Sequence, residues 1–320
     1  MRIIFLKCLT FLLIMYGWSA VVQASDYPSR SIRVIVGPGI DTPARIIGDE
    51  IAKRLHTQVI VESKPLAGGA LAMNAVATAA PDGYTMLLAT AAYTINTAIG
   101  RFQLDLRKEF APVAHVADVK YALVVNPSVP VNSFAELLAY AKANPGKLNY
   151  ASVGIGTPPH MAGEMLKVQT GIDIVHVPFR DTGSAVTGLL GGNVQMMFLY
   201  SPLAEPQIKR GLLKGLALSA IEPSSFVPDI KPLAEQGVPN FDVVGWYGFV
   251  VPKGTPQEAI EKLSGAIQDA MKDPDVIAKI LKSGYELAKP NTPDEFSKFI
   301  DADTEKWIEL ANKIELKVRP

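Results

Sequence analysis

Few side chains in this sequence combine the types and spacing that catalysis or metal binding requires. His160 and Glu164 are four residues apart, which places both on one face of a helix and would supply half of a metal site. No His-Glu-x-x-His motif and no second ligand cluster accompanies them, which favours a helix-start or packing role. His176 lies in an apolar strand pattern and is interpreted as a core histidine. The sequence therefore predicts no metal and no cofactor.

Motifs for hydrolysis and phosphate binding are also missing. No Gly-x-Ser-x-Gly elbow occurs, and Gly68-Gly69 lacks the Lys-Ser/Thr that would follow in a phosphate loop. An exported carboxylate-processing enzyme remains the alternative to a binding protein, and an exported scaffold is a third class. Turnover of a carboxylate ester would favour the enzyme, whereas a scaffold would show no stabilisation by small ligands.

The remaining candidates are turns in which glycine and hydroxyl residues follow a short apolar strand. They span residues 37–42, 90–94, 154–157 and 180–184. In parallel α/β sheets such turns lie at the carboxyl ends of strands, where ligands bind, and free N–H groups at a helix start point at an anion. Each turn alone is compatible with an ordinary helix cap. Four together favour a ligand cleft.

Alternating strands and helices position these turns. The first unit is predicted to contain strands at 32–36, 58–62 and 84–89, with helices at 41–55 and from Gly68-Gly69 to about 80. The pattern then restarts with strands at 121–125, 148–152, 174–177, 194–198, 212–218 and 246–251, and helices from Ser133, at 160–169, 184–190, 256–271 and 292–315. This order predicts parallel pairing with right-handed crossovers.

Two similar α/β units are therefore expected, joined by short strand crossings near residues 124 and 245. Lobe 1 is predicted to comprise residues 25–124 and 245–320, and lobe 2 residues 125–244. Neither boundary carries a Gly/Ser-rich or charged linker, which indicates a hinge rather than a flexible tether.

Residues 1–24 are predicted to be a cleaved export signal. Arg2 and Lys7 form a basic start, an apolar stretch from Cys8 to about Met15 follows, and small residues precede a cleavage site after about Ala24. That stretch is shorter than the ~20 apolar residues of a spanning helix. Cys8 is the single cysteine, so the remaining chain would have neither disulfide nor thiol chemistry.

Composition excludes two classes of partner. Residues 1–24 carry two of the 31 basic residues and none of the 31 acidic ones, so the exported chain would be slightly negative. Such a balance supplies no electrostatic footprint for nucleic acid or for an anionic membrane. The sequence predicts an exported globular protein.

Several uncommon segments carry a resemblance to a known family. They include Pro81-Asp82-Gly83-Tyr84, Pro145-Gly146-Lys147-Leu148-Asn149-Tyr150-Ala151-Ser152, His160-Met161-Ala162-Gly163-Glu164, Val175-His176-Val177-Pro178-Phe179-Arg180 and Gly245-Trp246-Tyr247-Gly248. In this order they resemble the periplasmic solute-binding proteins of tripartite tricarboxylate transporters, also called Bug receptors. The resemblance covers about Tyr27 to Glu315.

The resemblance implies a type II periplasmic binding protein fold, with two lobes closing around one small carboxylate. In such proteins backbone N–H groups, hydroxyls and bridging waters hold the carboxylate. It also implies a monomer without catalytic activity, whose partners are the carboxylate and the membrane subunits of the transporter, which would recognise the closed form.

This chain departs from the family pattern at three places. The loop of residues 37–41 is shorter by about two residues, in a segment that usually supplies backbone contacts to the ligand. Asp181 replaces a usual glycine. Leu199 follows Phe198 where many members carry an aspartate that could receive an ammonium group, which argues against an amino-acid ligand.

Aromatic residues gather where the cleft is expected, namely Tyr93, Phe179, Tyr200, Trp246 and Tyr247. With Leu199 they indicate a more apolar wall than citrate would need. An aromatic mono- or dicarboxylate is the preferred ligand, and an aliphatic di- or tricarboxylate is the alternative. The residues predicted to bind it are Gly39, Asp41, Thr90, Ala91, Tyr93, Gly156, Thr157, His160, Phe179, Arg180, Asp181, Thr182, Leu199 and Tyr200.

Overall fold

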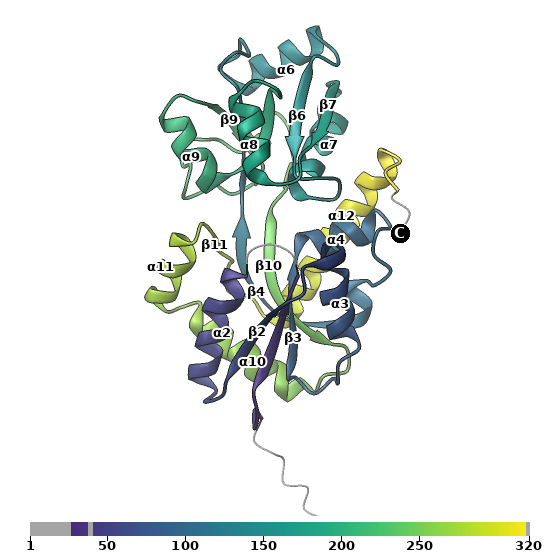
Figure 1. The fold of residues 1–320 in the computed structure, drawn as a ribbon, viewed down its shortest axis with the longest axis vertical. Helices are drawn as coiled ribbons and strands as arrows, with labels where there is room; N and C mark the ends of the chain where they lie inside the picture. The colour runs from purple at the N-terminus through teal and green to yellow at the C-terminus, as the bar shows by residue number, and fades with distance from the viewer. Residues whose placement is uncertain (1–26, 38–40, 318–320) are drawn as a thin grey trace, which may run out of the picture.

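The protein consists of two α/β lobes stacked on each other, as Figure 1 shows. The computed structural model describes residues 27–37 and 41–317. The predicted signal segment and Gly39 lie outside these residues. Within them, no helix has the length and apolar character needed to cross a membrane.

The lower lobe is built on a six-stranded sheet of order β11-β4-β10-β3-β1-β2. Its strands are β1 (Ile32–Val36), β2 (Val59–Ser63), β3 (Thr85–Thr90), β4 (Phe110–Val119), β10 (Gly245–Pro252) and β11 (Glu286–Leu287). The pairs β1–β2 and β1–β3 are parallel, as expected from the strand–helix alternation. β10 runs antiparallel to both β3 and β4.

The helices of this lobe are α2 (Thr42–Arg54), α3 (Ala70–Ala77), α4 (Ala91–Ala98), α5 (Leu106–Glu109), α10 (Gln257–Ala270), α11 (Pro274–Lys282) and α12 (Pro293–Lys313), with a short 3-10 turn η1 (Leu66–Gly69). They pack on two apolar clusters, the first of which continues into the upper lobe. One contains Tyr93 of α4, Trp246 of β10 and Trp307 of α12. The other contains Ile47 of α2, Ile267 of α10 and Tyr285.

The upper lobe has a five-stranded sheet of order β7-β6-β8-β5-β9. Its strands are β5 (Tyr121–Val125), β6 (Leu148–Ser152), β7 (Ile174–Pro178), β8 (Met196–Tyr200) and β9 (Lys214–Leu218). Its helices are α6 (Phe134–Ala143), α7 (Pro158–Thr170), α8 (Thr182–Leu190) and α9 (Ser201–Lys209), with the 3-10 turn η2 (Leu233–Gln236).

Lys120 is the residue between the two sheets at the first crossing, because β4 ends at Val119 and β5 begins at Tyr121. This crossing lies a few residues before the predicted position near 124, since Tyr121–Val125 pairs entirely with the upper sheet. The return crossing precedes β10 at Gly245. α12 lies along α4 in the lower lobe (Figure 1).

Candidate ligand-binding site

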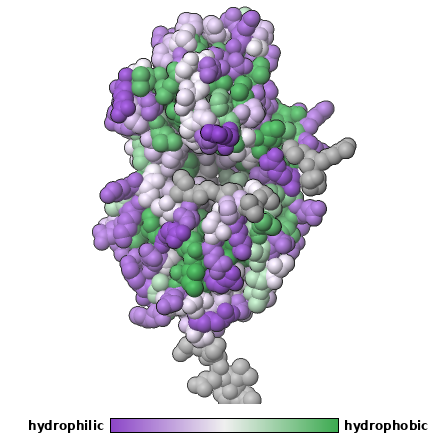
Figure 2. Space-filling model, in the orientation of Figure 1, coloured by the Kyte–Doolittle hydropathy of each residue, from purple (hydrophilic) through white to green (hydrophobic). Residues whose placement is uncertain are grey.

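A cavity of about 540 Å³ lies between the two lobes, where the carboxyl ends of β1 and β3 face the upper sheet. Figure 2 shows an indentation on the left side of the molecule at this level. Among residues 27–37 and 41–317, the lining contains no Asp, Glu, Lys, Arg or His. Its polar side chains are three threonines and five tyrosines: Thr90, Thr157, Thr182, Tyr93, Tyr121, Tyr200, Tyr247 and Tyr285.

The start of α4 forms the polar part of the lower wall. Thr90 is the N-cap residue in extended conformation, and its side chain makes no capping hydrogen bond. Ala91 and Ala92 follow as the first helical residues and line the cavity. Because the first N–H groups of a helix have no partner within it, this end of α4 offers unpaired donors and a positive dipole to the cavity.

Tyr93 adds a hydroxyl to the same wall. Its hydroxyl is buried and has no hydrogen-bond partner within the described residues. Burial raises the pKa of Tyr93 well above its ordinary value, so the group stays a neutral donor. A Cβ atom on Gly37 would lie 2.5 Å from this hydroxyl, so the close approach requires glycine there. The lower wall therefore presents donors without a cation.

Asp303 of α12 fixes α4 and β10 in place. Its Oδ2 atom lies 2.6 Å from the Thr94 hydroxyl and accepts a 2.9 Å hydrogen bond from the Trp246 indole. Its other oxygen pairs with the Lys306 ammonium at 2.8 Å. Asp303 is only 3% exposed. This buried carboxylate ties together the helix and the strand that carry the lower wall.

The start of α7 forms the facing wall and is different in character. Thr157 is its N-cap residue, but the Thr157 hydroxyl donates to the Gly154 carbonyl at 2.7 Å. Pro158 and Pro159 follow, and both line the cavity. Because proline has no N–H group, these two positions offer apolar rings where α4 offers donors.

Other apolar residues complete the upper wall. They are Val153, Met197, Phe198, Leu199 and Leu203. Thr182, the first residue of α8, adds a second threonine hydroxyl to the upper wall, besides that of Thr157. The cavity thus has a donor-rich lower wall and a largely apolar upper wall.

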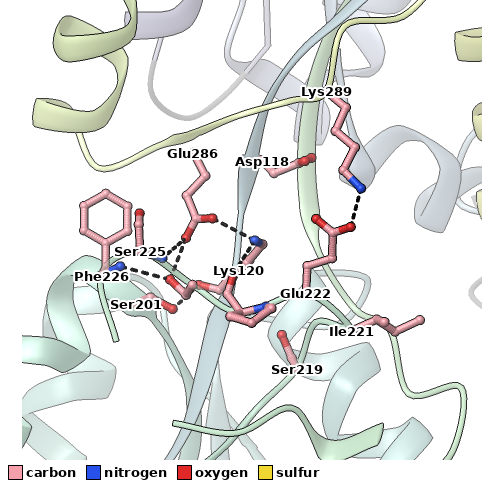
Figure 3. A network of polar contacts seen from close by, with 12 residues as sticks. Asp118, Lys120, Ser201, Ser219, Ile221, Glu222, Ser225, Phe226, Glu286 and Lys289 are labelled. Carbon is pink, nitrogen blue, oxygen red and sulfur yellow. Dashed lines mark hydrogen bonds and ion pairs between the residues drawn. The ribbon is translucent and has the colours of Figure 1, made fainter. Parts of the chain in front are cut away.

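Polar contacts between the lobes lie on both sides of the cavity. On the β11 side, the Lys120 ammonium pairs with Glu286 at 2.7 Å and donates to the Pro223 carbonyl at 2.7 Å (Figure 3). Glu286 also accepts a 2.5 Å hydrogen bond from Ser224, and Lys289 pairs with Glu222. We call these contacts the β11 brace.

On the α4 side, two side chains of the lower lobe donate to the turn before α7. The Arg101 guanidinium donates to the Ile155 carbonyl at 3.2 Å, and the Asn96 amide to the Gly156 carbonyl at 3.3 Å. We call this pair the α4 clasp. The lobes therefore make polar contacts at both edges of the cavity.

The sequence of residues 43–316 matches the family described as the tripartite tricarboxylate transporter family receptor. The chain belongs to this family. A UPF0065 protein of Bordetella pertussis is 35% identical over 293 residues, which cover 89% of each chain. A solved structure of a periplasmic transporter is 36% identical with a TM-score of 0.77, covering 91% of this chain and 99% of that chain.

MatC from Rhodopseudomonas palustris, solved with bound malate, is 29% identical with a TM-score of 0.74, covering 89% of this chain and 99% of that one. These likenesses confirm the predicted periplasmic binding protein fold. Membership of the receptor family confirms that the protein is a solute-binding receptor and not an enzyme.

The structure brings seven of the predicted site residues together at the cavity of this receptor. They are Thr90, Ala91, Tyr93, Thr157, Thr182, Leu199 and Tyr200. Six others lie outside the lining: Asp41, Gly156, His160, Phe179, Arg180 and Asp181. Gly39 lies outside the described residues.

Local contacts explain why three charged residues, Asp41, Arg180 and Asp181, lie outside the lining. Asp41 forms a 2.6 Å ion pair with Arg45. Arg180 is 90% exposed and pairs with its neighbour Asp181 at 3.0 Å. Asp181 also caps α8 by accepting from the Ser184 N–H at 2.7 Å.

The other three residues outside the lining, Phe179, Gly156 and His160, are held by contacts within the protein. Phe179 packs so closely on α8 that a Cβ on Gly188 would lie 2.8 Å from its ring. The Gly156 carbonyl is engaged in the α4 clasp. His160 points into the upper lobe, where its ring centroid lies 4.4 Å from that of His176.

His176 belongs to a buried polar cluster that superficially resembles catalytic machinery. Its Nε2 atom lies 2.6 Å from the Ser152 hydroxyl. Ser152 is fully buried, however, so no substrate reaches that hydroxyl. Burial lowers the pKa of both histidines, that of His160 to about 4, and the neighbouring His176 adds to the shift of His160. The cluster is internal to the fold.

Sequence reasoning missed part of the lining. Tyr121, Pro158, Pro159 and Tyr285 were not predicted to be site residues, and Tyr247 was noted only as one of the aromatic residues near the cleft. The proximity of Pro158 and Pro159 to the 154–157 turn was an available signal. Tyr285 lies at no strand-to-helix turn, and no sequence pattern pointed to it.

Proposed function

We propose that the protein is an exported receptor for a singly charged carboxylate with an apolar or aromatic body, which it delivers to the membrane subunits of a tripartite transporter. The observation that carries this proposal is the contrast between the walls of the cavity. Donors without a cation line the lower wall, and prolines and aliphatic side chains line the upper wall.

In this proposal the carboxylate of the ligand lies at the start of α4. Thr90, the N–H groups of Ala91 and Ala92, and the Tyr93 hydroxyl are the donors available to it. Hydrogen bonds to a charged group contribute about 1.5–3 kcal/mol each, and a helix N-terminus adds up to about 2 kcal/mol. Three such contacts approach the ~8 kcal/mol of a micromolar Kd after the cost of association.

The body of the ligand is placed against Leu199, Tyr200 and the two prolines of α7, with Thr182 at its edge. Burying apolar surface there contributes about 25 cal/mol per Å². A second carboxylate in this region would lose its hydration without meeting a cation, because the described lining has none. This favours an aromatic monocarboxylate over an aliphatic di- or tricarboxylate.

An aliphatic dicarboxylate is the second candidate. The likeness to MatC, which was solved with malate, supports it. Hydroxyls and bridging waters would then have to hold the second carboxylate.

Titration calorimetry of residues 25–320 with benzoate, malate and citrate separates these candidates. We expect benzoate to bind at least about tenfold more tightly than malate, a difference of about 1.4 kcal/mol. Tighter binding of malate would replace the proposal by the second candidate. Binding of none of the three would remove both.

Export is the second part of the proposal. A signal at residues 1–24 fits the periplasmic relatives, and cleavage is expected after about Ala24. Mass measurement of the protein recovered from the periplasm tests it. Recovery of an uncleaved chain starting at Met1 would contradict the cleavage.

A further inference from the structure

Four tyrosines gather at the end of the cavity next to the β11 brace. Tyr121 and Tyr200 are directly opposite each other on β5 and β8, so they come from the upper lobe. Tyr247 on β10 and Tyr285 just before β11 come from the lower lobe, with ring centroids 5.2 Å apart in an edge-to-face arrangement. All four line the cavity, and we call them the phenol cluster.

The phenol cluster borders the proposed carboxylate site through Tyr247, whose position on β10 pairs directly with Thr90 on β3. Tyr285 lies one ring further on, with its ring centroid 5.2 Å from that of Tyr247. Tyr285 and Tyr93 belong to different apolar clusters. A ligand whose carboxylate is bound at α4 would therefore meet Tyr285 beyond Tyr247, with its opposite end.

The four hydroxyls are neutral. Burial raises the pKa of each phenol above its ordinary value, and the neighbouring phenols raise those of Tyr121, Tyr200 and Tyr285 further. Ionising one of them in this surrounding would place an uncompensated charge in an apolar cavity. The phenol cluster thus offers hydrogen bonds without charge.

The hydrogen bonds within the phenol cluster are incomplete. Tyr200 donates to the Gly284 carbonyl, a contact that requires glycine because a Cβ would lie 2.4 Å from the hydroxyl. The Tyr285 hydroxyl is buried and approaches that of Tyr247, but within the described residues it makes no hydrogen bond of acceptable geometry. A buried hydroxyl left without a partner is destabilising, so a ligand oxygen that pairs with it gains affinity.

We infer that the phenol cluster is a second, uncharged polar subsite, in which Tyr285 binds a hydroxyl or carbonyl oxygen at the end of the ligand remote from its carboxylate. The subsite rests on the proposed function for the position of the carboxylate. A second carboxylate fits less well. The Tyr200 hydroxyl already donates its hydrogen bond to the Gly284 carbonyl, and the described lining residues include no cation. The ligand class is therefore an apolar or aromatic carboxylate with a distal hydroxyl or oxo group.

Paired ligands and a single-atom substitution test this subsite. Calorimetry would compare benzoate, 4-hydroxybenzoate and terephthalate on the wild-type protein, on Tyr285→Phe and on Tyr140→Phe. Tyr140 on α6 lies outside the cavity lining and controls for loss of a tyrosine hydroxyl. We expect 4-hydroxybenzoate to bind about tenfold more tightly than benzoate, and terephthalate not to gain over benzoate.

In Tyr285→Phe the advantage of 4-hydroxybenzoate over benzoate is expected to fall below about threefold. Tyr140→Phe should keep the full advantage. Without ligand, Tyr285→Phe should be at least as stable as the wild type, because the substitution removes an unpartnered hydroxyl. Loss of stability, or an advantage that survives in Tyr285→Phe, would overturn the inference.

Phenol itself distinguishes the inference from the proposed function, since it has the hydroxyl but no carboxylate. We expect phenol to bind more tightly than toluene, and Tyr285→Phe to abolish that difference. If this holds while none of the carboxylates binds, the proposed function fails and the subsite stands. If the carboxylates bind but neither hydroxyl-bearing probe is favoured, the subsite fails alone.

Discussion

Helices α4 and α7 begin on opposite walls of one cavity, and each begins with a threonine at its N-cap position. After Thr90 come two alanines, whose N–H groups remain available to a ligand. After Thr157 come two prolines, which have none. Proline is well suited to a first helical turn, so both helices form equally well. Under the proposed function, these two residues decide which lobe binds the anion.

The largest expected effect concerns the residue that positions α4. Replacing Asp303 by Ala removes the partner of Thr94, Trp246 and Lys306. Breaking a buried charge pair of this kind costs about 3–5 kcal/mol. Urea unfolding should show this loss. Asp301→Ala, on the exposed face of the same helix, should change stability by less than about 0.5 kcal/mol, and equal losses in both would contradict the role of Asp303.

The next effect separates pH dependence of stability from that of binding. The fold holds His160 and His176 neutral. Burial and the neighbouring His176 lower the pKa of His160 from 6.5 to about 4. Glu164 raises this pKa and Lys167 lowers it, both by smaller amounts. The unfolded chain then binds more protons between these values. Stability is complete above pH 6.5 and falls by up to about 3 kcal/mol as pH decreases towards 4.

Urea unfolding at pH 7.5 and pH 5 checks this dependence. His160→Gln should flatten it, whereas His56→Asn, at an exposed position, should not. Affinity for a carboxylate should stay constant from about pH 6 to 9, because the titratable side chains of the described lining are tyrosines with raised pKa values. A change in Kd near pH 6.5 would show that a histidine is linked to the site.

A matched pair of substitutions compares the two N-cap threonines directly. Thr90→Val removes a hydroxyl that is free to meet the ligand and should weaken carboxylate binding by about 1–3 kcal/mol. Thr157→Val removes a hydroxyl that already donates to Gly154, and should change Kd by less than about twofold. Calorimetry with benzoate gives both values. Equal weakening would mean that both walls hold the carboxylate.

The smallest effect would make the two walls more alike. Pro158→Ala restores an N–H group at the first position of α7. A helix N-terminus stabilises an anion by about 0.3–1 kcal/mol, so benzoate should bind about two- to fivefold more tightly while affinity for phenol stays the same. An equal gain for phenol would show that the change in shape, and not the N–H group, is responsible.

Sequence reasoning was most successful where local preference and final structure agree. Tyr121–Val125 was predicted with the bounds that the structure has, because tyrosine and valine favour strands. Leu148–Ser152 was also predicted with its observed bounds, because it directly follows the turn signal Pro145-Gly146. The strand β4 was missed, since Pro112 and several alanines weaken its local signal and pairing with β10 and β11 stabilises it. α9 was missed because Pro202 and Pro206 lie within it.

In the candidate site, too, sequence reasoning succeeded where local sequence decides the position of a residue and failed where tertiary contacts decide it. Thr90 and Tyr93 were accessible from sequence because they directly follow a strand end. Arg180 and Asp181 also follow one, yet they pair with each other at the surface, a choice that depends on side-chain geometry. Tyr285 reaches the cavity only because β11 pairs with the distant β4, and such long-range pairing leaves no trace in local sequence.

The α4 clasp offers a position for an optical probe. Ile155, whose carbonyl Arg101 contacts, is 38% exposed, so a dye attached to Ile155→Cys would lie at the edge where the lobes meet. The single native cysteine is Cys8, within the predicted signal, so residues 25–320 carry no competing thiol. Because Arg101 binds a main-chain oxygen, the substitution keeps that contact, and dye emission would report any change at the clasp when a ligand is added.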